Sequence, residues 1–287
     1  MKPTLLFLLL FLFVNSLPSS SQILLTDIAT APASATCQAT VAQTGLVALF
    51  NNQAGLTEVK KFAATVATEW RFGVKDLKPI AFGLVLPAKS GVFGFTFNHF
   101  SFETTQQNAF GLAFAKKMSP KMSAALGLKM AQYGVTEYGS TLFISFEVGF
   151  YYQLFDDIKV GFHTQNPLQQ KIGVGDFTPS VFRLGAAYQV NEAVDVNVEC
   201  AKDNVLGADF RLGVNYKINP TLVLRGGIAT LPTRFAFGLG YHLSEKFVMD
   251  LGLSSHTILG LTPSVNLSYQ LKASNSKPNH SPLSPTK

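Results

Sequence analysis

Apart from a stretch at its N-terminus, the sequence has no apolar run that could form a transmembrane helix, which needs about 20 consecutive apolar residues. It also has only two cysteines, Cys37 and Cys200. The two are not expected to pair, because Cys200 continues a row of valines on one strand face, whereas Cys37 lies in a polar N-terminal segment. These absences argue against a helical membrane protein and against a disulfide.

Charged residues are few, at 14% of the chain against 47% hydrophobic residues, and basic residues number 23 against 17 acidic ones. No run of basic residues is interleaved with aromatics, so a nucleic-acid partner is not expected. No serine sits in a nucleophile elbow, and no glycine pattern of a nucleotide-binding loop is present. The histidines lie singly, without the spacing of metal ligands: His99, His163, His242, His256 and His280. We therefore expect no enzyme activity, no cofactor and no metal.

The N-terminus has the pattern of a cleaved secretory signal. Lys2 precedes an apolar run over residues 5–14, which is followed by the helix breaker Pro18 and by small residues up to Ser21. The run is too short to anchor the chain in a bilayer, which disfavours a signal anchor. We predict a signal peptide over residues 1–21 and export from the cytoplasm.

From Phe62 onward, apolar residues recur at every second position, the period of a β-strand with one apolar face. The pattern indicates about fourteen strands, most near the ~10 residues that a tilted strand needs to cross a membrane. We predict an all-β fold, an antiparallel transmembrane β-barrel over residues 61–272, and weigh against it a soluble β-sandwich. The predicted strands are 62–72, 80–86, 93–97, 110–114, 124–130, 142–154, 158–162, 182–190, 194–200, 210–218, 222–228, 235–241, 247–253 and 263–271.

Five tyrosines support this fold, because each stands where a predicted strand ends and is followed by a polar and an aliphatic residue. Each lies on the same strand face as the apolar residues upstream of it. Aromatic rings at the boundary between an apolar strand face and a turn form the girdle of a membrane barrel. Short polar turns follow the first four, and short turns are periplasmic in outer-membrane barrels. The predicted girdle consists of Tyr152, Tyr188, Tyr216, Tyr241 and Tyr269.

The other face of the predicted strands carries glycine repeatedly, at positions 83, 94, 111, 127, 149, 161, 185, 213, 238 and 252. Glycine weakens a strand, so this repetition indicates that something approaches the wall closely, or that the glycines serve only curvature. We expect the N-terminal segment, residues 22–60, to plug the lumen against them. Within this segment, the spacing of Ala42, Leu46, Leu49 and Phe50 predicts one short helix.

Charged side chains also fall on the inward face, since charges on the lipid face would be costly. If the hairpins close at the predicted turns, Arg183 comes near Glu199 and Glu147 comes near His163. Such charges most simply join the wall to a plug, with selection of an ion or solute as one alternative and catalysis as another. The predicted lumen charge network consists of Glu147, His163, Arg183, Asp195, Glu199, Arg211, Arg225 and Asp250.

A short motif precedes the first predicted strand. Residues 45–56, GLVALFNNQAGL, resemble the "A-x-x-x-N-P-A-G-L" segment of FadL-like outer-membrane proteins, most of all the PorV/PorQ branch associated with type IX secretion. In those proteins the motif follows an N-terminal segment that lies inside a barrel of fourteen strands. The resemblance extends over roughly residues 37–272. The motif residues here are Asn52, Gln53, Ala54, Gly55 and Leu56, with Gln53 in place of the proline.

The resemblance implies a protein of the outer membrane of a Gram-negative bacterium, in contact with outer-membrane lipid. It implies a non-enzymatic docking or assembly component for a secreted, periplasmic or surface protein. The alternative is a FadL-like transporter or narrow pore for a small solute, gated by the N-terminal plug. The predicted connections are shorter than in fatty-acid transporters, and the predicted lumen is lined by charges and glycine rather than by an apolar pocket, which disfavours transport.

Residues 273–287 are mostly Ser, Pro, Asn and Lys without an apolar pattern, and they are predicted to form a disordered tail. We expect the last strand, up to Leu271, to serve as the recognition signal for membrane insertion despite this tail. Truncation after Lys272 should therefore leave insertion intact, as measured by outer-membrane fractionation. Loss of insertion would contradict this assignment.

Overall fold

The computed structural model describes residues 29–168, 180–203 and 207–271. The predicted signal peptide, the predicted tail and most of the connection that follows residue 168 lie outside the described residues. Among the residues described, no helix is long and apolar enough to cross a membrane.

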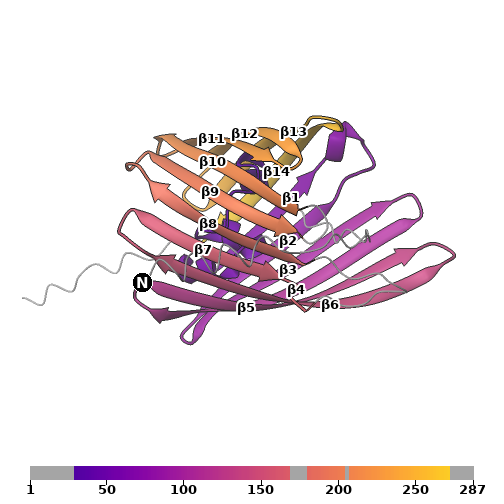
Figure 1. Ribbon diagram of the computed structural model, residues 1–287, viewed down its shortest axis with the longest axis horizontal. Coiled ribbons are helices and arrows are strands. Elements are labelled where there is room, and N and C mark those ends of the chain that lie inside the picture. Colours follow the sequence, from indigo (N-terminus) through magenta and orange to yellow (C-terminus); the bar gives the residue numbers. More distant parts are fainter. Residues whose placement is uncertain (1–28, 169–179, 204–206, 272–287) are drawn as a thin grey trace, which may run out of the picture.

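Fourteen antiparallel strands form a closed barrel, which confirms the predicted fold (Figure 1). Each strand pairs with its neighbours in the sequence, and β1 closes the barrel against β14 from Ala63 opposite Gln270 to Glu69 opposite Ser264. The strands are β1 (Ala63–Glu69), β2 (Ile80–Ala88), β3 (Gly91–Phe102), β4 (Thr105–Ser119), β5 (Met122–Val135), β6 (Gly139–Gln153), β7 (Ile158–Gln165), β8 (Val181–Gln189), β9 (Val194–Asp203), β10 (Gly207–Asn219), β11 (Leu222–Thr230), β12 (Thr233–His242), β13 (Phe247–His256) and β14 (Gly260–Gln270).

The alternating pattern places apolar side chains on the outside of the barrel. On β6, Leu142, Ile144 and Phe146 are exposed, whereas Phe143 and Ser145 between them are buried. Outward apolar rows of this kind recur around the wall and are the surface that a bilayer, rather than water, would cover. The strand prediction succeeded because a strand with its apolar side chains on the outside of the barrel has the same period of two as a strand with its apolar side chains inside.

The barrel has two different ends. We call one of them the terminal end, because β1 begins there and β14 ends there. The short turns after β2, β4, β6, β8, β10 and β12 lie at the same end. At the opposite end, the hairpins β3–β4 and β5–β6, with strands of 12 to 15 residues, project beyond the rest of the wall (Figure 1). By the rule that short turns are periplasmic, the terminal end is expected to face the periplasm.

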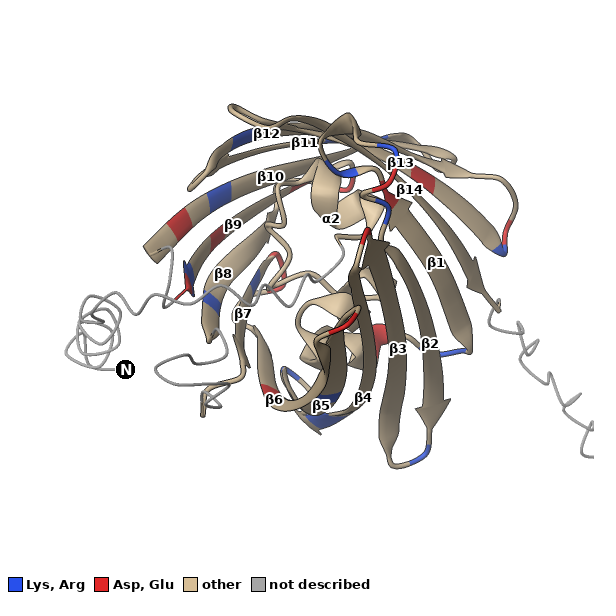
Figure 2. Ribbon diagram, turned by 90° about the vertical axis from the view of Figure 1, so that its right-hand side faces the viewer, with Lys and Arg blue, Asp and Glu red and all other residues tan. Residues whose placement is uncertain are grey.

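The N-terminal segment lies within the ring of strands (Figure 2). We call residues 30–58 the plug; they contain the α-helix α2 (Ala31–Ala35) and the 3-10 helices η1 (Leu46–Phe50) and η2 (Gln53–Glu58). A further 3-10 turn, η3 (Arg71–Gly73), lies in the connection after β1, so this strand is shorter than predicted.

The single predicted helix through Ala42 is therefore wrong in extent and type. Gly45 has φ of +88°, a left-handed conformation that starts a new turn and leaves Ala42 outside it. No sequence pattern predicts α2, in which Pro32 occupies the first turn, where proline is tolerated.

The plug lies against the inward glycines. At eight of the ten glycine positions, the nearest atoms to an added Cβ include the plug, and Gly111 and Gly127 face neighbouring wall side chains instead. A Cβ on Gly213 would come within 2.7 Å of Thr36 Cβ, and one on Gly94 within 2.7 Å of Leu49 Cδ1. These glycines give the plug the space to pack directly on the backbone of the wall.

Gly161→Ala should loosen the plug, because a Cβ at this position would overlap the carbonyl of Val41. Overpacking costs about 1–3 kcal/mol, which corresponds to an opening equilibrium raised about thirtyfold at the middle of this range. Alkylation of Cys37 in a Cys200→Ser background measures this opening. Cys37 is buried, and burial raises the pKa of its thiol to about 11, so alkylation should be slow while the plug is in place. The rate of alkylation should rise with the substitution.

Gly226→Ala is the matched control, because the nearest atom to an added Cβ there is the Ala236 carbonyl at 3.9 Å, an ordinary contact. Equal alkylation rates in the two variants would show that the plug does not depend on close approach at Gly161.

Candidate functional site

The buried carboxylate of Glu199 joins the plug to the wall. The Glu199 side chain, on β9, is 0% exposed. Its Oε1 accepts hydrogen bonds from Arg183 Nε at 2.7 Å and from Arg211 Nη1 at 3.1 Å. Its Oε2 accepts from the backbone amides of Thr40 at 2.9 Å and Val41 at 2.8 Å. The charge is thus shared between two wall arginines and the plug backbone, which is the condition for burying a carboxylate.

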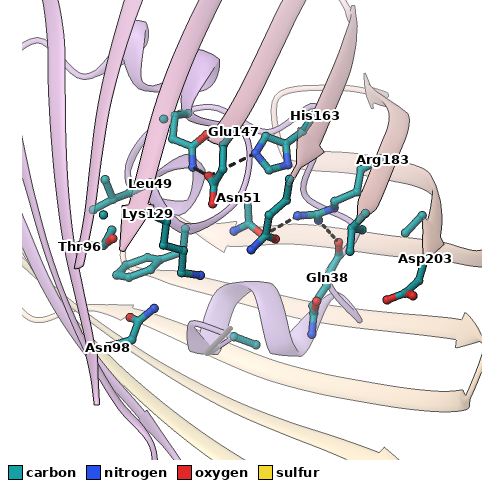
Figure 3. A pocket seen from close by; sticks show the side chains of 18 of the residues that line it. Gln38, Leu49, Asn51, Thr96, Asn98, Lys129, Glu147, His163, Arg183 and Asp203 are labelled. Carbon is teal, nitrogen blue, oxygen red and sulfur yellow. Dashed lines mark hydrogen bonds and ion pairs between the residues drawn. The ribbon is translucent and has the colours of Figure 1, made fainter. Parts of the chain in front are cut away.

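Arg183, on β8, also binds the plug directly. Its Nη1 donates to Asn51 Oδ1 at 3.2 Å, and its Nη2 donates to the Gln38 carbonyl at 3.0 Å and to Thr40 Oγ1 at 3.1 Å. Figure 3 shows Arg183 between Gln38 and Asn51. One arginine therefore holds two parts of the plug that are far apart in its sequence.

Two residues outside the predicted network extend this cluster toward the opposite end. Asp209 Oδ2 accepts from Arg211 Nε at 2.8 Å and from Arg234 Nη2 at 2.7 Å. Its Oδ1 accepts from the backbone amide of Leu231 at 2.9 Å, which fixes the β11–β12 turn. The period of two in their strands already places both residues on the inward face, although the predicted network does not include them.

The contacts from the plug use groups that no sequence pattern marks. The Gln38 carbonyl and the two amides that bind Glu199 belong to the backbone, which every residue carries. Thr40 and Asn51 stand among many similar polar residues. Sequence reasoning therefore found the wall half of the cluster and missed the plug half.

Asn52 anchors the plug motif in the wall. The side chain is fully buried, and its Nδ2 donates to the carbonyls of Val41 at 2.8 Å and Phe150 at 2.9 Å. Its Oδ1 accepts from the amide of Ala54 at 3.3 Å and occupies the space that a Cβ on Gly149 would need. The asparagine thereby ties two plug segments to β6.

The other motif residues lie in the same interface. Gln53 Nε2 donates to Glu147 Oε2, so the residue that replaces the proline of the resembled motif makes a polar contact with the wall. Gly55 lies so close to the Gln43 carbonyl that an added Cβ would come within 2.5 Å of it. Leu56 and Ala54 are fully buried in the apolar core between plug and wall.

The remaining predicted charges fall into separate pairs. His163 Nε2 lies 3.5 Å from Glu147 Oε2, and the two side chains face each other in Figure 3. Arg225 Nη1 donates to Asp250 Oδ1 at 2.8 Å, near α2. Asp195 lies 3.8 Å from Lys217 at the terminal end, where both are partly exposed. The structure thus brings together Arg183, Glu199 and Arg211 and distributes the other charges around the lumen.

Cavities lie on both sides of the plug. One of about 270 Å³ opens toward the opposite end between Gln38 and Phe50 of the plug and Asn98, His163 and Arg234 of the wall. Another of about 170 Å³ lies toward the terminal end and is lined by plug residues 42–44 together with wall residues that include Lys159 and Asp195. The Arg183 and Glu199 contacts lie at the level between them.

The five girdle tyrosines lie on the outward face near the terminal end. Tyr152, Tyr188, Tyr216 and Tyr241 are exposed. Tyr269 is half-buried, with its ring centroid 5.0 Å from that of Phe247 and 6.3 Å from that of Phe62. This arrangement places the phenol groups where strands meet turns, as a boundary with the membrane surface would require.

Cys37 and Cys200 are both free thiols, as predicted. Among the described residues, no group of three or more His, Cys, Asp or Glu side chains is arranged to hold a metal ion.

A plugged barrel of fourteen strands defines a class of membrane protein, and solved structures share its fold. The Pseudomonas putida toluene transporter TodX superposes with a TM-score of 0.66 at 12% identity over 87% of this chain and 99% of TodX. The Ralstonia pickettii toluene transporter TbuX gives 0.64 at 14% identity, over 85% and 98% of the two chains. A Pseudomonas aeruginosa FadL homologue gives 0.63 at 12% identity, also over 85% and 98%. At these identities the likeness shows a FadL-like fold.

Residues 30–281 match the family described as type IX secretion system membrane protein PorP/SprF. The match spans most of the sequence, so the chain belongs to this family. No curated protein matches it. The association with type IX secretion is thus confirmed at the level of the family, through PorP/SprF, and the PorV/PorQ branch is not confirmed.

Arg183→Ala should loosen the plug, because it removes five hydrogen bonds, two to Glu199 and one each to Asn51, Gln38 and Thr40, together with one charge of a buried pair. Breaking such a pair costs about 3 kcal/mol or more. The expected result is faster proteolysis within residues 29–50, measured by mass spectrometry of the fragments.

Arg225→Ala is the control, because Arg225 is also a luminal arginine but pairs with Asp250 on the wall. Protection of residues 29–50 that is unchanged in Arg183→Ala would rule out this pairing as the restraint on the plug.

Proposed function

We propose that this protein is a non-enzymatic docking or assembly component of the type IX secretion machinery, a barrel held closed by its own N-terminal segment. In this proposal, the mature chain begins at Gln22, residues 22–60 form the closing segment and residues 61–272 form the outer-membrane barrel. Membership of the PorP/SprF family supports the link to secretion. The partner would be a secreted, periplasmic or surface protein.

The observation that carries the proposal is the coordination of Glu199. Displacing the plug would strip this buried carboxylate of two backbone donors and would break the contacts of Arg183 with the plug. Leaving a buried charge without its partners costs several kcal/mol. A segment restrained in this way is suited to a constant structural role and less suited to a gate that opens at each turnover.

The luminal cavity of about 270 Å³ favours the alternative, a transporter or narrow pore for a small solute. TodX and TbuX are named as toluene transporters and share the fold. Fold alone does not carry function, however, and the cavity here is lined by Lys129, Glu147, Arg183 and Arg234 as well as by apolar groups. A solute of this cavity would therefore be polar.

Capture of the native protein from outer membranes in mild detergent should recover a protein partner in comparable amount. The measurement is quantitative mass spectrometry of the captured material, with an unrelated barrel carrying the same tag as control. A partner enriched only with this protein would support the docking role.

Recovery of the barrel alone would count against docking and lead to flux measurements in liposomes. Flux through the intact protein, raised by deletion of residues 22–56, would establish the transport alternative. Flux only after the deletion would indicate a hole made by removing the plug.

A further inference from the structure

The rim of the terminal end carries an uneven distribution of charge. One sector of it, formed by the start of β1 and the turns that connect β2 to β3 and β4 to β5, carries six exposed lysines. We call them the lysine sector: Lys60, Lys61, Lys89, Lys116, Lys117 and Lys121. Among the described residues of these segments, Glu58 is the one carboxylate.

The strand register brings these segments side by side. The β1–β2 ladder ends with Ala63 opposite Val85, and Lys61 precedes Ala63 by two residues. The β3–β4 ladder ends with Val92 opposite Ala115, and Lys116 follows Ala115 directly. Lys117 Nζ lies 2.7 Å from Glu58 Oε1 and Lys60 Nζ lies 3.7 Å from Glu58 Oε2. The last residue of the plug, Glu58, is therefore in contact with the end of β4. With six lysines and one carboxylate, the sector keeps a large excess of positive charge.

The rest of the same rim has a different chemistry. All five girdle tyrosines lie on β6, β8, β10, β12 and β14. The turns of that part carry the carboxylates of Asp156, Asp157, Glu192 and Glu245. At the terminal end of β1 to β5 there is no tyrosine, and lysines occupy the boundary instead.

We propose that the lysine sector binds the phosphate groups of anionic phospholipids in the leaflet that surrounds the terminal end. Lys116 lies on the outward face, following Phe110, Leu112 and Phe114 at period two, so its stem continues the lipid-facing row. The Phe93 and Phe114 rings, with centroids 4.9 Å apart, form the last apolar layer above it. A lysine at this position extends its ammonium group into the headgroup layer.

Clustered lysines at a membrane surface attract anionic lipids, and the attraction grows with each lysine. The outward position of Lys116 at the end of the apolar band favours a lipid over a soluble acidic protein, which would approach from beyond the rim. The occupied sector would hold the barrel in a fixed orientation relative to the lipid around β1 to β5. This inference is independent of the docking role proposed above.

The test compares the full-length protein with Lys89→Gln/Lys116→Gln/Lys121→Gln. Lys117 is retained because it pairs with Glu58. The matched control, Lys75→Gln/Lys78→Gln/Lys246→Gln, removes the same charge elsewhere and keeps the Lys217 pair with Asp195. Each protein is purified in detergent, its folding is verified by circular dichroism and heat-modifiability, and its retention of added phosphatidylglycerol or phosphatidylcholine is counted by native mass spectrometry.

Wild type and control should retain phosphatidylglycerol in preference to phosphatidylcholine, and the lysine-sector variant should retain it at least about tenfold more weakly. Equal retention in both variants, or no preference for phosphatidylglycerol in wild type, would overturn the proposal. Loss of an acidic copurifying protein from the lysine-sector variant, with lipid retention unchanged, would also overturn it and assign the surface to that protein.

Discussion

The structure depends on the burial of one charge, the carboxylate of Glu199. A carboxylate without solvent must be matched by donors, and here the donors come from both halves of the molecule: Arg183 and Arg211 from the wall, and the amides of Thr40 and Val41 from the plug. If either half were removed, the charge would remain only partly satisfied. The wall and the plug therefore depend on each other for stability, and the polar interior of the barrel specifies where the N-terminal segment must lie.

The same dependence appears in the apolar part of the interface. A barrel of fourteen strands encloses more space than inward side chains alone fill, and here the chain's own N-terminal segment occupies it. Glycine would ordinarily weaken the strands, yet at Gly94, Gly161 and Gly213 its lack of a side chain allows Leu49, Val41 and Thr36 to lie against the backbone. The stability lost by each glycine in its strand is offset by contacts that exist only when the plug is present.

Most of the wall could be predicted from the sequence, because a lipid-facing strand repeats with the period of two that any strand shows. The pairing of Arg183 with Glu199 followed from the hairpin register, since both lie on the inward face of adjacent strands. The plug could not be predicted in this way. The five-residue helix α2 is too short to show a period, and Gly45 interrupts the helical spacing through Ala42. The plug's contacts with Glu199 and Arg183 run largely through backbone atoms, which carry no sequence signal.

The docking role and the transport alternative proposed above make different demands on the N-terminal segment, and the interior of the barrel bears on the choice between them. In a transporter, the segment in the lumen must leave its contacts at a rate compatible with flux, so those contacts should be few or exchangeable with water. Here Glu199 is fully buried, Asn52 binds two carbonyls in a site that also has no solvent exposure, and Leu56 lies in a shared apolar core. These three restraints act on different parts of the plug, so releasing one leaves the others in place. A lumen restrained in this way supports the docking role proposed above more than the transport alternative.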